Sequence, residues 1–123
     1  MDRKRLKSLM PYPTAKEHGQ KLAKALDETN PIAKTSLIRI IQYLGLEWAE
    51  DCYHATEKVQ SEGGLSVADG SRKRSFGGVF LHLAKKEMDS DQRWFIFYLP
   101  RAKAKKHKKA MQSSKKNKNQ NSE

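Results

Sequence analysis

The sequence has little cysteine and no long apolar run. Cys52 is the single cysteine among 123 residues, so an internal disulfide and a cysteine-rich zinc site are both excluded. No segment approaches the ~18 apolar residues of a membrane-spanning helix, and the basic start is not followed by the apolar run of a secretory signal. We therefore expect a soluble intracellular protein, cytoplasmic or nuclear depending on the host.

Motifs of nucleotide-dependent and catalytic proteins are also missing. The stretch GGLSVADGSRKRSFGG, residues 63–78, has neither the G-x-x-x-x-G-K-[ST] order of a phosphate loop nor the G-x-G-x-x-G order of a dinucleotide site. The acids at 47, 50 and 51 fall early in a helix, where they complement its dipole. No metal-ligand spacing joins Cys52 to the histidines, which are His18, His54, His82 and His107. The sequence predicts a protein that is not an enzyme and uses no cofactor or metal.

Positive charge is abundant and unevenly placed. The net charge is +11, and residues 101–123 hold nine lysines and arginines against Glu123 alone. The start MDRKRLK supplies the remaining excess, so the middle of the chain is nearly neutral. This pattern indicates a module held against a polyanion by basic arms. Alternatively, the lysine tail only keeps the protein soluble.

The length allows one small domain with extensions. We expect a basic extension over residues 1–13, a folded domain over 14–100 and a disordered Lys-rich tail over 101–123. A first helix is expected after Thr14 as N-cap. A second follows Asn30 and Pro31 and ends at Gly45.

The rest of the domain also favours helices. A third helix is expected from Leu46 to about Gln60, with one apolar face made of Trp48, Cys52, Ala55 and Val59. Residues 65–68 suggest a short extended piece before a turn at Asp69-Gly70. A fourth helix opens at Gly77, and capping residues at 89–91 favour a fifth over the apolar run 94–99. The predicted fold is all-α, with about five helices and a glycine-rich basic loop.

The segment SRKRSFGG, residues 71–78, combines cations with the start of a helix. Unpaired backbone N–H groups and a partial positive charge at a helix start favour phosphate, and glycine allows its close approach. Arg72, Lys73 and Arg74 would hold phosphates beside this start, and Phe76 or Phe80 would offer a stacking ring. The spacing of Phe80 equally suits a core residue, and Trp48 and Trp94 are expected in the core. The ligand that fits this arrangement is a single-stranded nucleic acid.

The stretch DGSRKRSFGGVFLHLAKKE, residues 69–87, resembles the RNA-binding domain family of the phosphorylated adapter for RNA export (PHAX). The similarity runs from about residue 38 to about residue 98. It implies a compact helical domain that binds single-stranded RNA with little sequence preference. On this basis the predicted RNA-binding residues are Asp69, Gly70, Ser71, Arg72, Lys73, Arg74, Phe76, Gly77, Gly78, Phe80 and Lys85.

The chain departs from the family motif, roughly GG…DGSRRRTPGGVF, at three positions. Lys73 replaces an arginine, and Ser75-Phe76 stands where Thr-Pro is usual, which makes the helix entry less rigid and adds a ring. The export adapters also have long additional regions for which this chain has no room, so the resemblance implies the RNA-binding module without the adapter role.

Two other functions remain open. The chain could be an interaction protein, expected to be monomeric like the RNA binder, whose basic loop binds an acidic protein surface. A nucleic-acid-processing enzyme would need acids or histidines converging on the loop.

Overall fold

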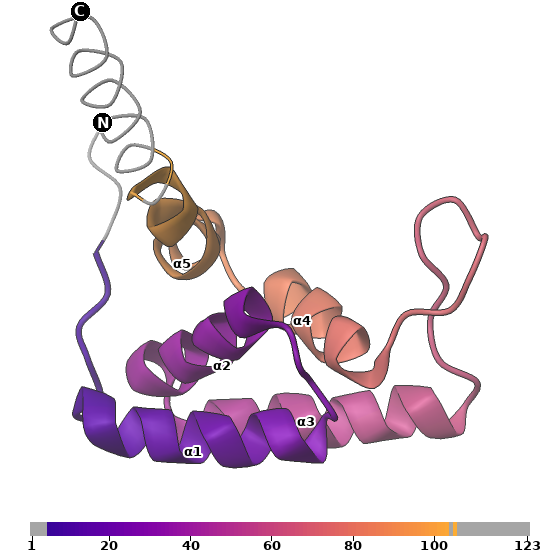
Figure 1. Ribbon diagram of the computed structural model, residues 1–123, viewed down its shortest axis with the longest axis horizontal. Coiled ribbons are helices and arrows are strands. Elements are labelled where there is room, and N and C mark those ends of the chain that lie inside the picture. Colours follow the sequence, from indigo (N-terminus) through magenta and orange to yellow (C-terminus); the bar gives the residue numbers. More distant parts are fainter. Residues whose placement is uncertain (1–4, 104, 106–123) are drawn as a thin grey trace, which may run out of the picture.

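The computed structural model describes residues 5–103 and 105, and every regular element within them is a helix (Figure 1). The all-α prediction is confirmed. None of the described helices is both long and apolar enough to cross a membrane. The elements are α1 (Tyr12–Ala25), α2 (Pro31–Leu44), α3 (Leu46–Ser61), α4 (Phe76–Glu87), α5 (Ser90–Arg93) and a π-helical turn, η1 (Trp94–Tyr98).

The first two helices follow their capping signals to different degrees. The Asn30 side chain accepts hydrogen bonds from the N–H groups of Ile32 (2.8 Å) and Ala33 (3.3 Å), as the sequence predicts. By contrast, α1 starts at Tyr12, before the predicted cap Thr14, and its N-cap is Pro11 with no side-chain bond. Proline is preorganised for a first helical turn, which explains the earlier start.

A glycine sets the close approach of α1 to α2. A Cβ built at Gly19 would lie 2.5 Å from Cγ1 of Ile38 and 3.0 Å from its Cα. Real Cβ atoms do not come this close to backbone, so only glycine fits without a shift of the helices. The residue that weakens α1 as an isolated helix therefore lets it pack against α2.

The buried face of α3 differs from the predicted one. Its buried residues are Ala49, Cys52 and Thr56, whereas Ala55 is exposed and Trp48 is only half-buried. The hydroxyl of Thr56 donates to the carbonyl oxygen of Cys52 at 2.7 Å. Because its hydroxyl is paired, this threonine can be buried without leaving a polar group unsatisfied. Hydrophobic periodicity does not count such a residue as apolar, and the predicted face was therefore wrong.

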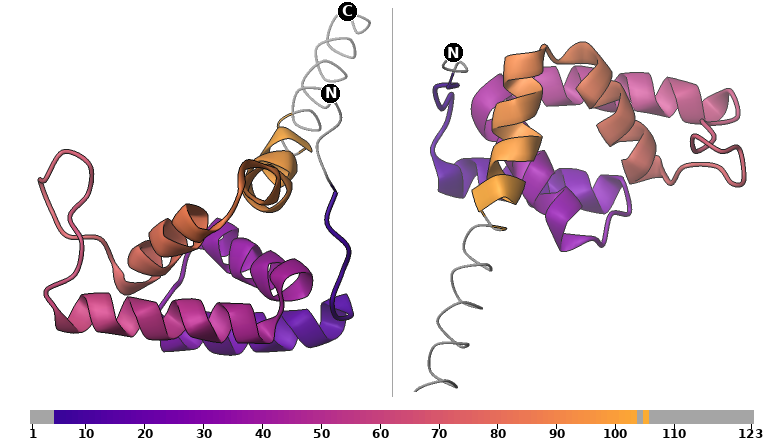
Figure 2. Two further views of the ribbon diagram at one scale, coloured as in Figure 1. Left: turned by 180° about the vertical axis from the view of Figure 1, so that it is seen from behind. Right: turned by 90° about the horizontal axis from the view of Figure 1, so that it is seen from above.

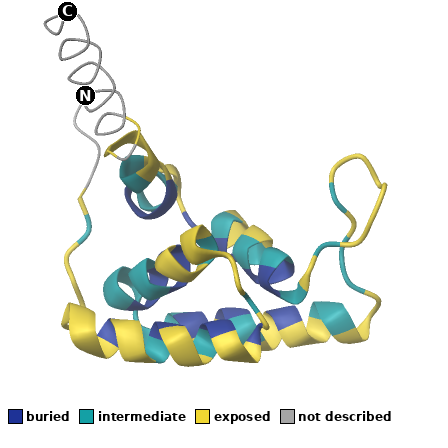
Figure 3. Ribbon diagram, in the orientation of Figure 1, coloured by how far each residue is buried: buried dark blue, intermediate teal, exposed yellow. Residues whose placement is uncertain are grey.

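The core lies between the helices, on the faces that they turn toward one another (Figure 3). Phe80 of α4 is 0 % exposed and is among the largest fully buried side chains. The Cys52 thiol donates to the Phe80 carbonyl oxygen at 3.6 Å, and burial raises its pKa to about 12. Cys52 is thus a protonated residue of the core that joins α3 to α4.

The last helix begins where the sequence predicts and ends later. Asp89 and Gln92 form a reciprocal capping box. The helix then passes through η1 and Pro100 and continues to residue 103, three residues beyond the predicted domain boundary. The rest of the predicted tail, apart from residue 105, lies outside the described residues.

Arg39 of α2 explains how this helix accommodates Pro100. The Leu99 N–H bonds the carbonyl of Trp94, five residues back, and Pro100 has no N–H to offer. Arg39 donates instead to the carbonyls of Phe95 (Nη2, 2.6 Å) and Ile96 (Nε, 3.2 Å). These long-range bonds place the C-terminal helix, residues 90–103, across α2, as the view from above shows (Figure 2).

Candidate nucleic-acid interface

The basic residues lie on the loop between α3 and α4, which projects away from the helices (Figures 1 and 2). The Arg74 N–H donates to the Leu65 carbonyl at 2.6 Å, and the Val67 N–H donates to the Arg72 carbonyl at 2.9 Å. These bonds and an isolated antiparallel bridge between residues 66 and 73 hold the loop as a short hairpin. The loop therefore has a defined shape on which it carries its cations.

The tip of the hairpin is a turn built by three predicted site residues. One Asp69 carboxylate oxygen accepts from the Ser71 hydroxyl (2.7 Å) and from the Ser71 N–H (3.0 Å), and these bonds lower the pKa of Asp69. Gly70 has a φ of +74°, which favours glycine. Asp69, Gly70 and Ser71 thus shape the turn, and the adjacent cations are the groups suited to phosphate.

Arg72 and Lys73 are exposed on the hairpin. Within residues 5–103 and 105, the sole ion pair is His54 with Glu57, so no described carboxylate neutralises either of these cations. Both side chains can bind an external anion without breaking an existing salt bridge.

Arg74 belongs to a second group of cations along α4. We call Arg74, Lys85 and Arg101 the cation cluster. Burial lowers the pKa of Lys85, and the positive charges of Arg101 and Arg74 lower it further, so each of the two arginines lies within electrostatic range of Lys85. The Lys85 ammonium lies 4.8 Å from the centre of the Phe97 ring. The cluster joins the end of α4 to the C-terminal helix.

One donor of the cation cluster, Arg74 Nε, has no hydrogen-bond acceptor among the described residues. This nitrogen atom is buried. Buried polar atoms are usually paired, and like charges held together repel each other. Nε itself is closed to solvent, so an anion bound beside Arg74, Lys85 and Arg101 would relieve the second cost, the repulsion of like charges.

The start of α4 differs from the open phosphate site that the sequence predicts. Ser75 Oγ accepts from the Gly78 N–H at 3.1 Å, which caps the helix. Gly77 is buried, and a Cβ there would collide with the Glu28 carboxylate. The space beside these glycines is occupied by the protein's own oxygen atoms, so we assign Gly77 and Gly78 to packing and capping.

The two predicted stacking rings are also placed differently. Phe80 is fully buried, so its ring is a core element and offers no stacking surface, which corrects that part of the prediction. Phe76 is half-buried and packs edge-to-face against Tyr53, with ring centres 5.8 Å apart. Of the two, Phe76 alone keeps part of its surface at the base of the hairpin.

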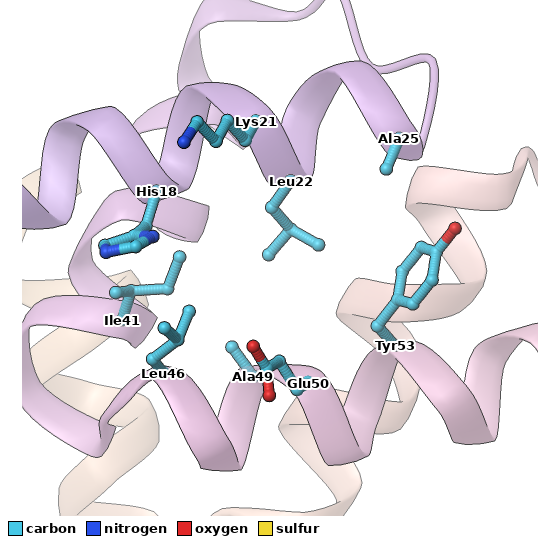
Figure 4. A pocket seen from close by; sticks show the side chains of 9 residues that line it. All are labelled: His18, Lys21, Leu22, Ala25, Ile41, Leu46, Ala49, Glu50 and Tyr53. Atoms are coloured by element: carbon cyan, nitrogen blue, oxygen red, sulfur yellow. The ribbon is translucent and has the colours of Figure 1, made fainter.

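A separate pocket of about 280 Å³ lies between α1 and α3 (Figure 4). Leu22, Ile41 and Leu46 form apolar walls, and the Glu50 carboxylate lies beside them. This negative group disfavours a polyanion at the pocket. The described residues contain no cluster of three or more groups that could hold a metal ion.

Sequence reasoning missed Arg101 as a member of the site. It follows Pro100 and was assigned to the tail, because proline is expected to end a helix. The long-range bonds from Arg39 stabilise the helix beyond Pro100. A local sequence pattern does not predict bonds between residues so far apart in the chain. Lys85, in contrast, is present in both the predicted set and the cluster.

Comparison with known proteins gives a consistent family. The profile of the "Phosphorylated adapter RNA export protein, RNA-binding domain" matches residues 18–102. The human phosphorylated adapter RNA export protein (Homo sapiens) is 34 % identical over 100 residues, which cover 79 % of this chain and 25 % of that protein. The bovine protein (Bos taurus) is 37 % identical over 79 residues, which cover 63 % and 20 %.

The chain spans a quarter or less of the length of these relatives. No solved structure matches it. The family profile covers more than half of the chain and includes the hairpin, α4 and the C-terminal helix as far as residue 102. The chain therefore belongs to the family of the RNA-binding domain of the phosphorylated adapter for RNA export.

Proposed function

We propose that this chain is a non-catalytic domain that binds single-stranded RNA with little sequence preference. The observation that carries the proposal is the cation cluster, whose charges have no ion-pair partner among the described residues. Backbone phosphates of the RNA bind to this cluster and to the exposed Arg72 and Lys73 of the hairpin. The family description, an RNA-binding domain, supports the same ligand class.

The weak sequence preference follows from the kind of contact proposed, because the cations of the hairpin and the cluster bind phosphates and not base edges. The Asp69 carboxylate is engaged by Ser71, and Arg39 is engaged by backbone carbonyls. Contacts to phosphates fix the position of a strand but do not distinguish its bases. A single strand also adapts its phosphate spacing to the hairpin and the cluster, whereas a duplex presents a fixed spacing.

The experiment compares fluorescent single-stranded RNA, duplex RNA and single-stranded DNA on the full chain. The loop variant Arg72→Ala/Arg74→Ala is measured beside Lys16→Ala/Lys24→Ala, which removes two exposed cations from α1. We expect the first pair to weaken single-stranded RNA binding roughly tenfold or more and to flatten its salt dependence by about 1.4 in log–log slope, at ~0.7 per phosphate. The second pair should have little effect. Circular dichroism checks that both variants are folded.

Two results would contradict the proposal. Equal losses in the two double variants would mean that binding follows net charge, with the basic ends of the chain as its source. Equal competition by polyglutamate and by single-stranded RNA would favour the alternative function, an interaction domain for an acidic protein surface.

A further inference from the structure

A groove lies between α2 and the C-terminal helix, next to the cation cluster. Its volume is about 190 Å³. Apolar atoms of both helices form its walls, and the residues that matter here are Ile32, Thr35, Arg39, Phe97, Pro100 and Arg101. The groove exists because the helix continues past Pro100, held by the bonds from Arg39.

The groove and the cation cluster share residues. Arg101 belongs to both, and the Phe97 ring that lines the groove also carries the Lys85 ammonium 4.8 Å from its centre. A strand whose phosphates bind Lys85 and Arg101 therefore runs along the edge of the groove.

The charge of the groove also suits such a strand. Its described lining contains two arginines and no carboxylate. Each of three other pockets includes at least one carboxylate, although one of them also has three lysines, which are Lys21, Lys24 and Lys34. A lining with cations and no carboxylate suits a polyanion.

The two hydroxyls in the walls and part of the Arg39 guanidinium already have hydrogen-bond partners. The Thr35 hydroxyl donates to the Pro31 carbonyl at 3.0 Å, and the Ser36 hydroxyl donates to the Ile32 carbonyl at 3.2 Å. Arg39 donates to the carbonyls of Phe95 and Ile96. An occupant therefore meets apolar surface, with little to distinguish one hydrogen-bonding edge from another.

The side chain at the mouth of the groove is unusually uncovered. Ile32 is 63 % exposed, and so is Leu9 near the start of the described chain. A single exposed apolar side chain needs no special explanation. Ile32 differs from Leu9 because it lines a groove that adjoins the cation cluster.

We infer that this groove receives an unstacked nucleobase of the RNA strand whose phosphates bind the cation cluster. The inference rests on the proposed function and adds a base subsite to it. The face of the base lies against the exposed part of Ile32 and against Pro100, and its sugar-phosphate backbone remains at Arg101. Any of the four bases fits, because the contact is apolar.

The test uses the full chain and the variants Ile32→Ser and Leu9→Ser, which remove equally exposed apolar side chains. Each is titrated with a fluorescent oligouridine and with an abasic ribose-phosphate oligomer of the same length. Ile32→Ser should weaken binding of the oligouridine about fivefold and leave the abasic oligomer unchanged, because it removes apolar contact with a base. Leu9→Ser should change neither. Oligoadenosine should lose affinity for Ile32→Ser by a similar factor.

The outcomes separate the subsite from the proposed function. If Ile32→Ser loses affinity equally for both oligomers, or for neither, the base subsite is wrong. In that case a loss of both ligands in Arg72→Ala/Arg74→Ala would leave the proposed function standing. If the unaltered chain binds neither oligomer, the proposed function and the subsite fail together.

Discussion

The two ends of α4 differ in how their charges are satisfied. At the first end, Ser75 caps the Gly78 N–H, and the Glu28 carboxylate lies against Gly77. At the other end, Lys85 lies within electrostatic range of Arg101 and of Arg74, which comes from the hairpin before the helix, and the structure places no carboxylate in an ion pair with any of the three within its described residues. The Gly78 N–H at the start of the helix thus has an acceptor within the protein, whereas the cations of the hairpin and of the cluster have no ion-pair partner in the described part of the chain.

This difference shows how a helix can contribute to an anion site through its side chains. The partial positive charge at a helix start favours anions, but here the protein supplies its own carboxylate and hydroxyl oxygen. The partial negative charge at the helix end stabilises lysines, and Lys85 and Lys86 lie in the last turn. The helix thus supports cations at its end, and those cations are available to phosphate.

The largest expected effect concerns Phe80, which lies on the buried face of α4. Phe80→Ala should destabilise the fold by about 3–5 kcal/mol, because it removes a fully buried ring and leaves a cavity. Urea denaturation measures this loss. Phe80→Leu should remain folded and bind RNA as the unaltered chain does. A loss of RNA binding in folded Phe80→Leu would restore Phe80 to the binding site.

The next effect concerns the second end of α4. Lys85→Ala should weaken single-stranded RNA binding roughly fivefold and lower its salt slope by about 0.7, as expected for one phosphate contact. Lys86 is the matched control, because it is the exposed neighbour and is outside the cluster. Lys86→Ala should have a smaller effect on both quantities. Fluorescence anisotropy at several salt concentrations measures affinity and slope, and equal effects of the two variants would argue against a specific cluster.

The sequence predicts much of the fold because its signals are local. The Asn30 cap, the Asp89 capping box and the turn at Asp69-Gly70 each depend on residues within four positions of one another. The number of helices and the basic hairpin follow from such signals. The family resemblance adds the ligand class that the sequence pattern alone leaves open.

The parts of the site that the sequence does not predict depend on contacts between distant residues. Glu28 reaches the start of α4 from the connection between α1 and α2, and Arg39 bonds residues more than 50 positions away. The first contact fills the expected phosphate site, and the second carries the helix past Pro100 to Arg101. Neither contact has a local pattern, so the sequence predicts neither the filled space beside Gly77 nor the place of Arg101 near Lys85.

A smaller effect is expected at the capped end. Ser75→Ala should cost about 1 kcal/mol of stability, because the Gly78 N–H loses its acceptor. Ser75→Asp keeps an acceptor and adds negative charge, so its stability should stay close to that of the unaltered chain. Thermal denaturation measures both.

RNA binding by these two variants sharpens the comparison. If phosphates bind the cationic side chains and not the backbone N–H groups of the helix start, Ser75→Asp should weaken RNA affinity by less than about threefold, through repulsion that salt screens. A phosphate seated on the helix start would be displaced by the aspartate. A loss of tenfold or more in Ser75→Asp, with Ser75→Ala nearly unchanged, would therefore move the proposed phosphate contact back to that end.

The smallest effect concerns Glu28. Glu28→Gln keeps an oxygen that can accept from the Asn30 N–H, which the carboxylate accepts at 3.0 Å, and removes only the charge. Stability should fall by about 0.3–1 kcal/mol at low salt and by less at high salt, because the interaction with the helix dipole is screened. Glu17→Gln, an exposed residue of α1, is the control. RNA affinity should rise less than about twofold in either variant, as expected for a distant charge. A tenfold rise in RNA affinity confined to Glu28→Gln would instead identify the Glu28 carboxylate as an internal competitor of phosphate. The start of α4 would then be a phosphate site that this carboxylate occupies when RNA is absent.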